Sequence, residues 1–216
     1  MSEPAIATPK LTQRQIQRRE RILKVAQQLT GERGYDGASM RAIAAASHVA
    51  EKTLYNIFGS KDRLIAMAAQ HRSADVFEAA AQNVPDGGMA FLLAFGRRVA
   101  EVTLEAPEMA RVLAQVLLDH SDLVGLNDLY ELYVGLTFDQ MSGAGLIEER
   151  ASRASFIRLF RLGIVSAVIL WSKGEVSDED FARHLELEVL RALLPVMKPE
   201  ISATILVRVA EIARQL

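Results

Sequence analysis

Residues 39–61 constrain the fold more than any other part of the chain, because two short helical patterns are separated there by only three residues. Ser39 is a good N-cap for the first pattern, since its hydroxyl can accept a hydrogen bond from a free N–H at the helix start. Met40 to Ala46 favour helix strongly, and residues 47–49 form the break. A second short helix follows from about Ala50 to Phe58. So tight a connection between two helices predicts a helix-turn-helix.

The second of these helices has two chemically different sides. At about 100° per residue, the apolar side holds Leu54, Ile57 and Phe58, and the opposite side holds Lys52, Tyr55 and Asn56. Lysine and asparagine side chains can read base edges in the major groove, while tyrosine and threonine hydroxyls can reach phosphates. The pattern therefore predicts a helix that packs on its own domain with one side and contacts DNA with the other.

The surrounding positions carry a resemblance to a known family. They are Arg21, Ile22, Leu23, Ala26, Leu29, Gly34, Tyr35, Ser39, Ile43, Ala44, Val49, Thr53, Leu54, Tyr55, Phe58, Ser60, Lys61, Asp62 and Leu64. Together they resemble the DNA-binding domain of TetR-type (TetR/AcrR) transcriptional regulators, over roughly residues 19–68. The rest of the chain is similar to that family only in length and helical character. The resemblance implies an all-α fold, in which an N-terminal three-helix helix-turn-helix domain precedes a C-terminal helical domain for effector binding and dimerisation.

Four positions depart from the family pattern. His48 stands in the turn where glycine is common, so it is expected to need a positive φ, which histidine tolerates better than most residues. Ala50 stands where serine usually caps the second helix, and the missing cap costs ~1 kcal/mol. Lys52 and Asn56 stand where glycine and histidine or tyrosine are frequent. These differences indicate that the protein reads an operator of its own.

The resemblance also implies roles for individual side chains. Phosphate contacts are expected from Ser39, Tyr55 and Lys61, base contacts from Arg41, Lys52 and Asn56, and either kind from Thr53. A basic cluster at the start of the first helix, Arg14, Arg18 and Arg19, is expected beside the DNA. Two recognition helices, one from each subunit of a dimer, would enter successive major grooves of a near-palindromic site.

The charge distribution agrees with this division. Residues 1–73 contain twelve Lys and Arg against six Asp and Glu, a net charge of +6, whereas the remaining residues contain 13 against 21, a net charge of −8. Phosphate contacts supply most of the non-specific affinity for DNA, so a basic end and an acidic body suit a DNA-binding protein. Taken alone, the same charges would equally suit an ordinary solvated surface.

Length and composition set wider bounds. The chain has 216 residues, half of them hydrophobic, which is ample for a buried core. Its longest uncharged apolar stretch, Leu162 to Ser172, is shorter than the ~20 residues that cross a membrane. The first 13 residues have no apolar segment typical of a signal peptide, and the absence of cysteine excludes disulfides. We therefore expect a cytoplasmic protein without a membrane partner.

Helix-stop signals divide the chain into a disordered arm over 1–12, a helix-turn-helix domain over 13–73 and a ligand-binding and dimerisation domain over 74–216. The domain boundary is expected within one long helix, near Ser73. Helices are predicted over about 12–33, 40–46, 50–58, 61–83, 88–105, 108–120, 123–142, 148–173, 177–194 and 200–215.

Catalytic and metal chemistry find little support in the sequence. The four histidines are dispersed without a paired helical spacing, and Gly143-Ala144-Gly145 lacks the following Lys and Ser or Thr of a phosphate-binding loop. No nucleophile-elbow motif is present. We expect no cofactor, no metal and no enzymatic activity.

Two sets of residues in the second domain suggest further sites. An effector pocket is expected near Phe95, Met109, Leu113, Tyr130, Tyr133 and Trp171, which combine aromatic and thioether groups with polar handles. The alternative is that they simply fill a helical core. A dimer interface is expected on the helices over 148–173 and 177–194, at Phe160, Ile164, Ala167 and Leu190, because the first of these helices is apolar on much of its circumference. The alternative is the central helix of a monomeric core.

The sequence thus favours a homodimeric, ligand-responsive transcriptional regulator, usually a repressor in this family. A small-molecule effector would shift the population towards a spacing of the two DNA-binding heads that no longer fits the operator. A helical ligand-binding or adaptor protein that has lost DNA binding remains the alternative, and an α-helical enzyme is a third.

Overall fold

The computed structural model describes residues 11–84, 87–119 and 126–216, without the side chains of residues 113, 116–119 and 126. Within these residues the fold is all-α, as expected. The helices are α1 (Gln13–Gly37), α2 (Met40–Ala46), α3 (Glu51–Phe58), α4 (Lys61–Asn83), α5 (Gly88–Glu105), α6 (Pro107–Asp119), α7 (Leu126–Gly143), α8 (Arg153–Ser172), α9 (Asp178–Leu193) and α10 (Pro199–Ala213). The expected disordered arm over 1–12 lies almost wholly outside the described residues.

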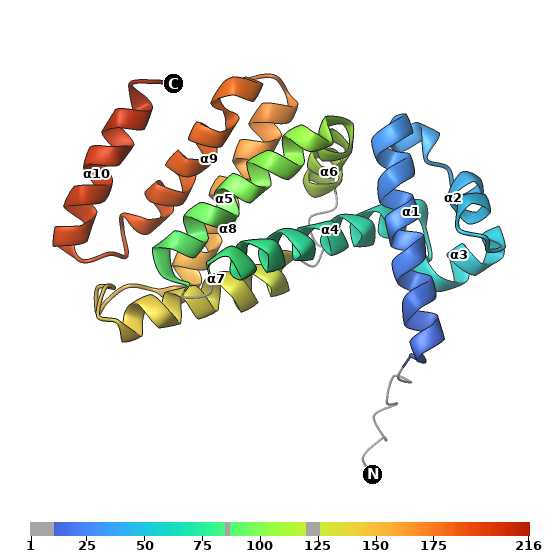
Figure 1. The fold of residues 1–216 in the computed structure, drawn as a ribbon, viewed down its shortest axis with the longest axis horizontal. Coiled ribbons are helices and arrows are strands. Elements are labelled where there is room, and N and C mark those ends of the chain that lie inside the picture. Colours follow the sequence, from blue (N-terminus) through green and yellow to red (C-terminus); the bar gives the residue numbers. More distant parts are fainter. Residues whose placement is uncertain (1–10, 85–86, 120–125) are drawn as a thin grey trace, which may run out of the picture.

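The first three helices form a head at one end of the molecule, together with the beginning of α4 (Figure 1). Side-chain hydroxyls begin three of these four helices: Thr12 caps α1, Ser39 caps α2 and Ser60 caps α4. Each accepts a hydrogen bond from a backbone N–H that has no partner within the helix. Gly34, with a φ of 68°, interrupts the last turns of α1, and Gly59, with a φ of 82°, ends α3. Local capping therefore fixes most helix boundaries of the head.

The long helix α4 runs from the head into the body and packs against α1 at one end and against α5 and α7 at the other (Figure 1). The body consists of α5 to α10. Its core is centred on α8, whose Phe156, Phe160 and Ala167 are at most 1% exposed. Helix α9 lies between α8, α5 and α10, and α10 packs on α9 at the end of the molecule distant from the head. Because α4 belongs to both parts, a boundary near Ser73 remains a prediction.

The start of α8 was predicted wrongly. The helix begins at Arg153 rather than Glu148, with Ser152 as its N-cap. The backbone before it is engaged elsewhere, since the N–H of Glu148 donates to the carbonyl of Val196 and the N–H of Lys198 donates to the carbonyl of Leu146. This short antiparallel pairing ties the start of α8 to the end of α9, a non-local contact that sequence periodicity does not reveal.

Of the described helices, α8 is the one long and apolar enough to cross a membrane by length and composition. Core helices of folded proteins pass the same test. Its Phe156, Phe160 and Trp171 are buried against other helices of the body.

Candidate functional site

The helix-turn-helix has the core that its sequence predicted. Ile43 of α2 and Leu54 of α3 are fully buried, and Phe58 is 1% exposed. The guanidinium carbon of Arg19 lies 5.1 Å from the centre of the Phe58 ring, so the first helix also packs against the end of α3. The apolar side of α3 is thereby held against α1, α2 and α4, and the opposite side of α3 is left to face outwards.

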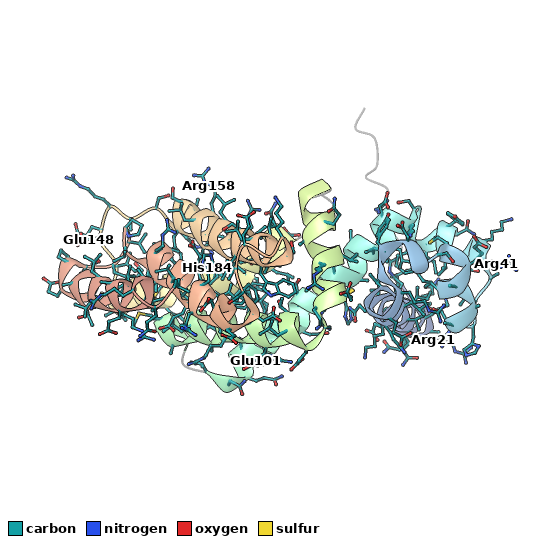
Figure 2. All side chains as sticks on the ribbon, turned by 90° about the horizontal axis from the view of Figure 1, so that it is seen from above. Arg21, Arg41, Glu101, Glu148, Arg158 and His184 are labelled. Atoms are coloured by element: carbon teal, nitrogen blue, oxygen red, sulfur yellow. The ribbon has the colours of Figure 1, made fainter. Side chains whose placement is uncertain are left out.

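The outward side of the head carries most of the residues expected to bind DNA. Ser39, Arg41, Lys52, Tyr55 and Asn56 are exposed, and Tyr55 has 48% of its surface accessible although it is a large aromatic residue. Thr53 is half-buried. Lys52 and Asn56 are four residues apart and therefore lie one turn apart on the same side of α3. Figure 2 shows Arg41 at the outer end of the head, away from the body. This surface offers donors and acceptors to a groove, while its role in binding DNA remains a prediction.

Two of the four departures from the family pattern, His48 and Ala50, have the structural consequences predicted for them. His48 has a φ of 52°, and it is the one described non-glycine residue with a positive φ. Ala50 begins α3 without a side-chain hydrogen bond at the cap. His48 thus holds its backbone conformation in the turn at some energetic cost, because L-residues are strained in the left-handed region.

Lys61 is engaged within the head in a way that sequence reasoning missed. Its Nζ donates to the backbone carbonyl of Tyr35 at 2.6 Å and lies 4.0 Å from the centre of the Tyr35 ring. The Tyr35 hydroxyl donates to Asp62 Oδ1. Burial and the hydrogen bond to Asp62 raise the pKa of Tyr35 to about 12. This cluster of Tyr35, Lys61 and Asp62 joins the end of α1 to the start of α4. No local sequence signal pairs these residues, because Tyr35 lies 26 positions before Lys61 in the chain.

The basic cluster at the start of α1 is only partly directed outwards. Arg14 is exposed and Arg18 is half-buried. Arg19 instead turns inwards, where its Nη2 approaches the Met67 sulfur at 3.6 Å and its guanidinium covers Phe58. Arg21 is exposed, and Figure 2 shows it on the head with Arg41. Arg19 therefore contributes to the packing of the head, and Arg21 is an exposed cation to which the sequence analysis gave no DNA contact.

A cavity of about 100 Å³ lies in the body, where α4, α5, α6, α7 and α8 meet. Its walls are formed by Arg72, Ser73, Val76, Phe77, Phe95, Val99, Val102, Thr103, Ala110, Tyr130, Ile164, Val165 and Val168. Ligand sites for drug-sized molecules usually measure ~300 to 1,000 Å³, so this cavity is smaller than a typical drug-sized site. Its lining is mainly apolar, with a few polar groups among the aromatic and branched side chains.

Two of the six predicted pocket residues, Phe95 and Tyr130, line this cavity. Their rings belong to an aromatic cluster in which Phe77 stacks on Phe95 with ring centres 4.1 Å apart. Complete burial raises the pKa of the Tyr130 hydroxyl. Tyr133 stacks on the Phe77 ring at 5.0 Å but does not line the cavity.

The remaining predicted pocket residues have other surroundings. Trp171 donates from Nε1 to Asp178 Oδ1 at 2.7 Å and packs on Phe181, which joins α8 to α9. Met109 is buried beside Gly31 of α1. The side chain of Leu113 lies outside the described part of the structure. The pocket is thus placed closer to α4 than was expected. Arg72 and Ser73 lie in a half-buried stretch of α4 that is flanked by buried residues on both sides.

The four residues expected at a dimer interface lie inside the chain. Phe160, Ile164, Ala167 and Leu190 are each at most 4% exposed, because they pack against other helices of the same body. They are therefore not available to a second copy, and this part of the prediction is corrected. The surface of α8 instead exposes Leu159 and Leu162, which are 47% and 53% accessible.

The comparisons agree with this fold. Residues 22–68 match the model of the family described as "Bacterial regulatory proteins, tetR family". A search of curated proteins gave no match. In the described residues, no group of three His, Asp or Glu side chains is arranged to hold a metal ion.

Several solved structures have the same architecture at low sequence identity. A TetR transcriptional regulator from Rhodococcus sp. RHA1 is 18% identical with a TM-score of 0.67, over 84% of this chain and 98% of that one. FadR from Thermus thermophilus, a TetR-family repressor in complex with lauroyl-CoA, is 21% identical with a TM-score of 0.65, over 81% and 93%. FadR from Bacillus halodurans is 14% identical with a TM-score of 0.63, over 84% and 96%. Residues 22–68 of the head thus match the tetR family model, and the chain as a whole has the fold of these solved TetR-family structures.

Proposed function

We propose that the protein is a sequence-specific DNA-binding transcriptional regulator of the repressor type, acting in the cytoplasm on a near-palindromic operator. The observation that carries the proposal is the outward side of α3, where Lys52, Tyr55 and Asn56 are exposed while Leu54 is fully buried beneath them. A helix held in this way presents base-reading and phosphate-binding groups together. The +6 charge of residues 1–73 supports the same reading, since it favours approach to phosphates.

The DNA-binding proposal is tested with the purified full-length protein and a library of random duplexes. Selection should enrich a short inverted repeat. Affinity for it should fall with salt at a log–log slope of about −0.9 per neutralised phosphate. Binding that depends on neither sequence nor salt would instead support a helical ligand-binding or adaptor protein that has lost DNA binding.

A second copy of the chain is proposed to cover the outer surface of α8. This surface exposes Leu159 and Leu162 and continues into the half-buried Val165 and Ile169. No charged residue interrupts the stretch from Leu162 to Ser172. An apolar helix surface that its own chain leaves uncovered favours burial in an oligomer. A twofold dimer would also supply two heads to the two halves of an inverted repeat.

The dimer is tested by analytical ultracentrifugation of two matched variants. Leu162 on α8 and Leu206 on α10 are both 53% exposed, so Leu162→Glu and Leu206→Glu place a charge on equally accessible sites. The first should yield folded monomers, because an unpaired charge in an apolar interface is costly. The second should remain dimeric. A wild-type protein that sediments as a folded monomer at micromolar concentration would contradict the proposal.

An effector is proposed to bind in the cavity of the body and to weaken DNA binding. The cavity supports this because it is bordered by α4, the helix that also packs against the head. The Thermus thermophilus repressor of the same fold holds lauroyl-CoA. Linkage makes the effect reciprocal, so operator DNA must weaken effector binding by the same factor. Titrations of effector with and without operator test this equality.

A further inference from the structure

Arg72 is an unusual member of the cavity wall. It lies in the middle of α4 and is half-buried, and its Nη2 donates to the backbone carbonyl of Val102 on α5 at 2.8 Å. Within the described residues it makes no ion pair. Burial lowers the pKa of Arg72, although the group stays charged at all physiological pH values. The guanidinium has thus lost part of its water and forms no direct ion pair in the described residues, although Glu105 and Asp75 favour its charge from a distance.

Two acids, Glu105 and Asp75, line a surface groove together with Arg72 but form no direct ion pair with it in the described residues. Glu105 pairs with Arg98 at 3.4 Å, and Asp75 lies 3.7 Å from His71. Both carboxylates influence the charge on Arg72 from a distance, and Arg98 opposes them. Five N–H donors are available on a guanidinium, and one is used by Val102. A carboxylate or phosphate group could accept two of the others in parallel.

The position of Arg72 places this charge at the edge of the cavity. Arg72 also lines a surface groove of about 460 Å³ between α1 and α6, so it borders both solvent and the interior. Beyond it the cavity is walled by Phe77, Phe95 and Ile164, which are buried and apolar. Arg72 therefore brings a cation to a rim that it shares with Glu105, and the other end of the cavity is apolar.

We propose that the cavity takes a small amphiphile with an apolar body and an anionic end, and that Arg72 holds the anion. This rests on the proposed effector function of the cavity. A volume of about 100 Å³ is of the order that holds a benzene ring or a short alkyl chain, since an engineered cavity of ~150 Å³ binds benzene. The ligand class is thus a short-chain or aromatic carboxylic acid.

The same residue is suited to transmit binding to the head. Gln27 of α1 donates to the carbonyl of Ala68 at 2.7 Å, one turn before Arg72 on α4. The bond from Arg72 to Val102 joins this part of α4 to the end of α5. An anion that takes over donors of Arg72 would alter the contact between α4 and α5 close to the point where α4 meets α1.

The test compares hexanoate with 1-hexanol, which share an alkyl chain and differ in charge, by titration calorimetry of the full-length protein. Wild type should bind hexanoate at least about tenfold more tightly than hexanol. Arg72→Gln should remove this preference while leaving hexanol affinity unchanged, and Arg72→Lys should retain part of it. Arg161→Gln is the matched control, because Arg161 is also half-buried and lines a groove on α7 and α8 that shares Tyr130 with the cavity.

The outcomes separate this proposal from the proposed function. Equal affinity of wild type for the two probes, or a preference that survives Arg72→Gln, would overturn the role of Arg72. If Arg161→Gln alone lost the preference for hexanoate, the anion would lie in the groove lined by Arg161, and the role of Arg72 would be overturned as well. If hexanoate binds as expected but leaves operator affinity unchanged, the ligand class holds and the effector function fails. If neither probe binds, the proposed ligand class is refuted. The DNA-binding proposal is unaffected by that result, because duplex selection tests it separately.

Discussion

Replacing Lys52 with alanine is predicted to reduce the specificity of DNA binding without reducing stability. Lys52 is exposed on α3 and makes no hydrogen bond or ion pair within the described residues. Surface substitutions of this kind usually change the free energy of unfolding by no more than about 0.5 kcal/mol. If Lys52 contacts a base, its loss costs about 1 to 3 kcal/mol on the operator, which is roughly 5- to 150-fold in affinity.

Lys61→Ala should behave differently because Lys61 is held by Tyr35. A hydrogen bond from a charged donor contributes about 1.5 to 3 kcal/mol, and a cation–π contact at an exposed site about 0.5 to 1 kcal/mol. Lys61 is half-buried, so solvent screening reduces their sum, and we expect a loss of about 1 to 2 kcal/mol in the free energy of unfolding. Affinity should fall by the same factor on operator and scrambled DNA, because the remaining donors of Lys61 Nζ are proposed to contact phosphate, and phosphate contacts are blind to sequence.

Fluorescence anisotropy with two labelled duplexes of equal length, one operator and one scrambled, measures the affinities at a fixed salt concentration. Urea unfolding measures stability. Lys173→Ala removes an exposed charge from the body at the end of α8 and serves as the control for net charge. The reasoning would be refuted if Lys52→Ala lost the same factor on both duplexes. An unchanged unfolding free energy in Lys61→Ala would show that the contact with Tyr35 contributes nothing.

Two further substitutions test the head itself. The pKa of Tyr35 is raised to about 12, so the unfolded chain loses this proton first and stability should fall between about pH 10 and 12. Because Tyr35 is partly solvated, we expect its share of the free energy of unfolding to be about 1 kcal/mol, and Tyr35→Phe should lose correspondingly less stability between about pH 10 and 12 in urea unfolding. His48→Gly should raise the free energy of unfolding by about 0.5 to 1 kcal/mol, since glycine accepts a φ of 52° without strain, although it loses more backbone entropy. A lower melting temperature of His48→Gly would contradict this account of the turn.

Much of the head could be predicted from the sequence because its structure is determined locally. Ser39 and Ser60 satisfy free N–H groups next to them in the chain, and Gly59 supplies a positive φ where α3 must end. The positive φ of His48 follows from its place in a turn of fixed length. Capping and turn geometry depend on residues only a few positions apart, so the residue types alone indicate them.

The roles of residues that meet across the chain could not be predicted in the same way. Lys61 carries a charge that suits a phosphate, but the structure places its Nζ on Tyr35, 26 positions earlier in the chain. Arg19 belongs to a basic stretch and yet covers Phe58. Both residues remain consistent with a DNA-binding head, because they fix the geometry of the helices that present Lys52 and Asn56.

The body shows the same division between local and non-local information. The sequence by itself determined that the body is helical, where most of its helices begin and end, and that α8 is apolar on more than one side. Only the tertiary structure decided which of those sides is covered. It buried Phe160 and Ala167 within the chain, left Leu162 exposed, and placed Arg72 at the edge of a cavity bounded by five helices. The physical reason is that helical periodicity records which residues share a face of one helix, whereas a cavity or an interface depends on how the faces of several helices pack together.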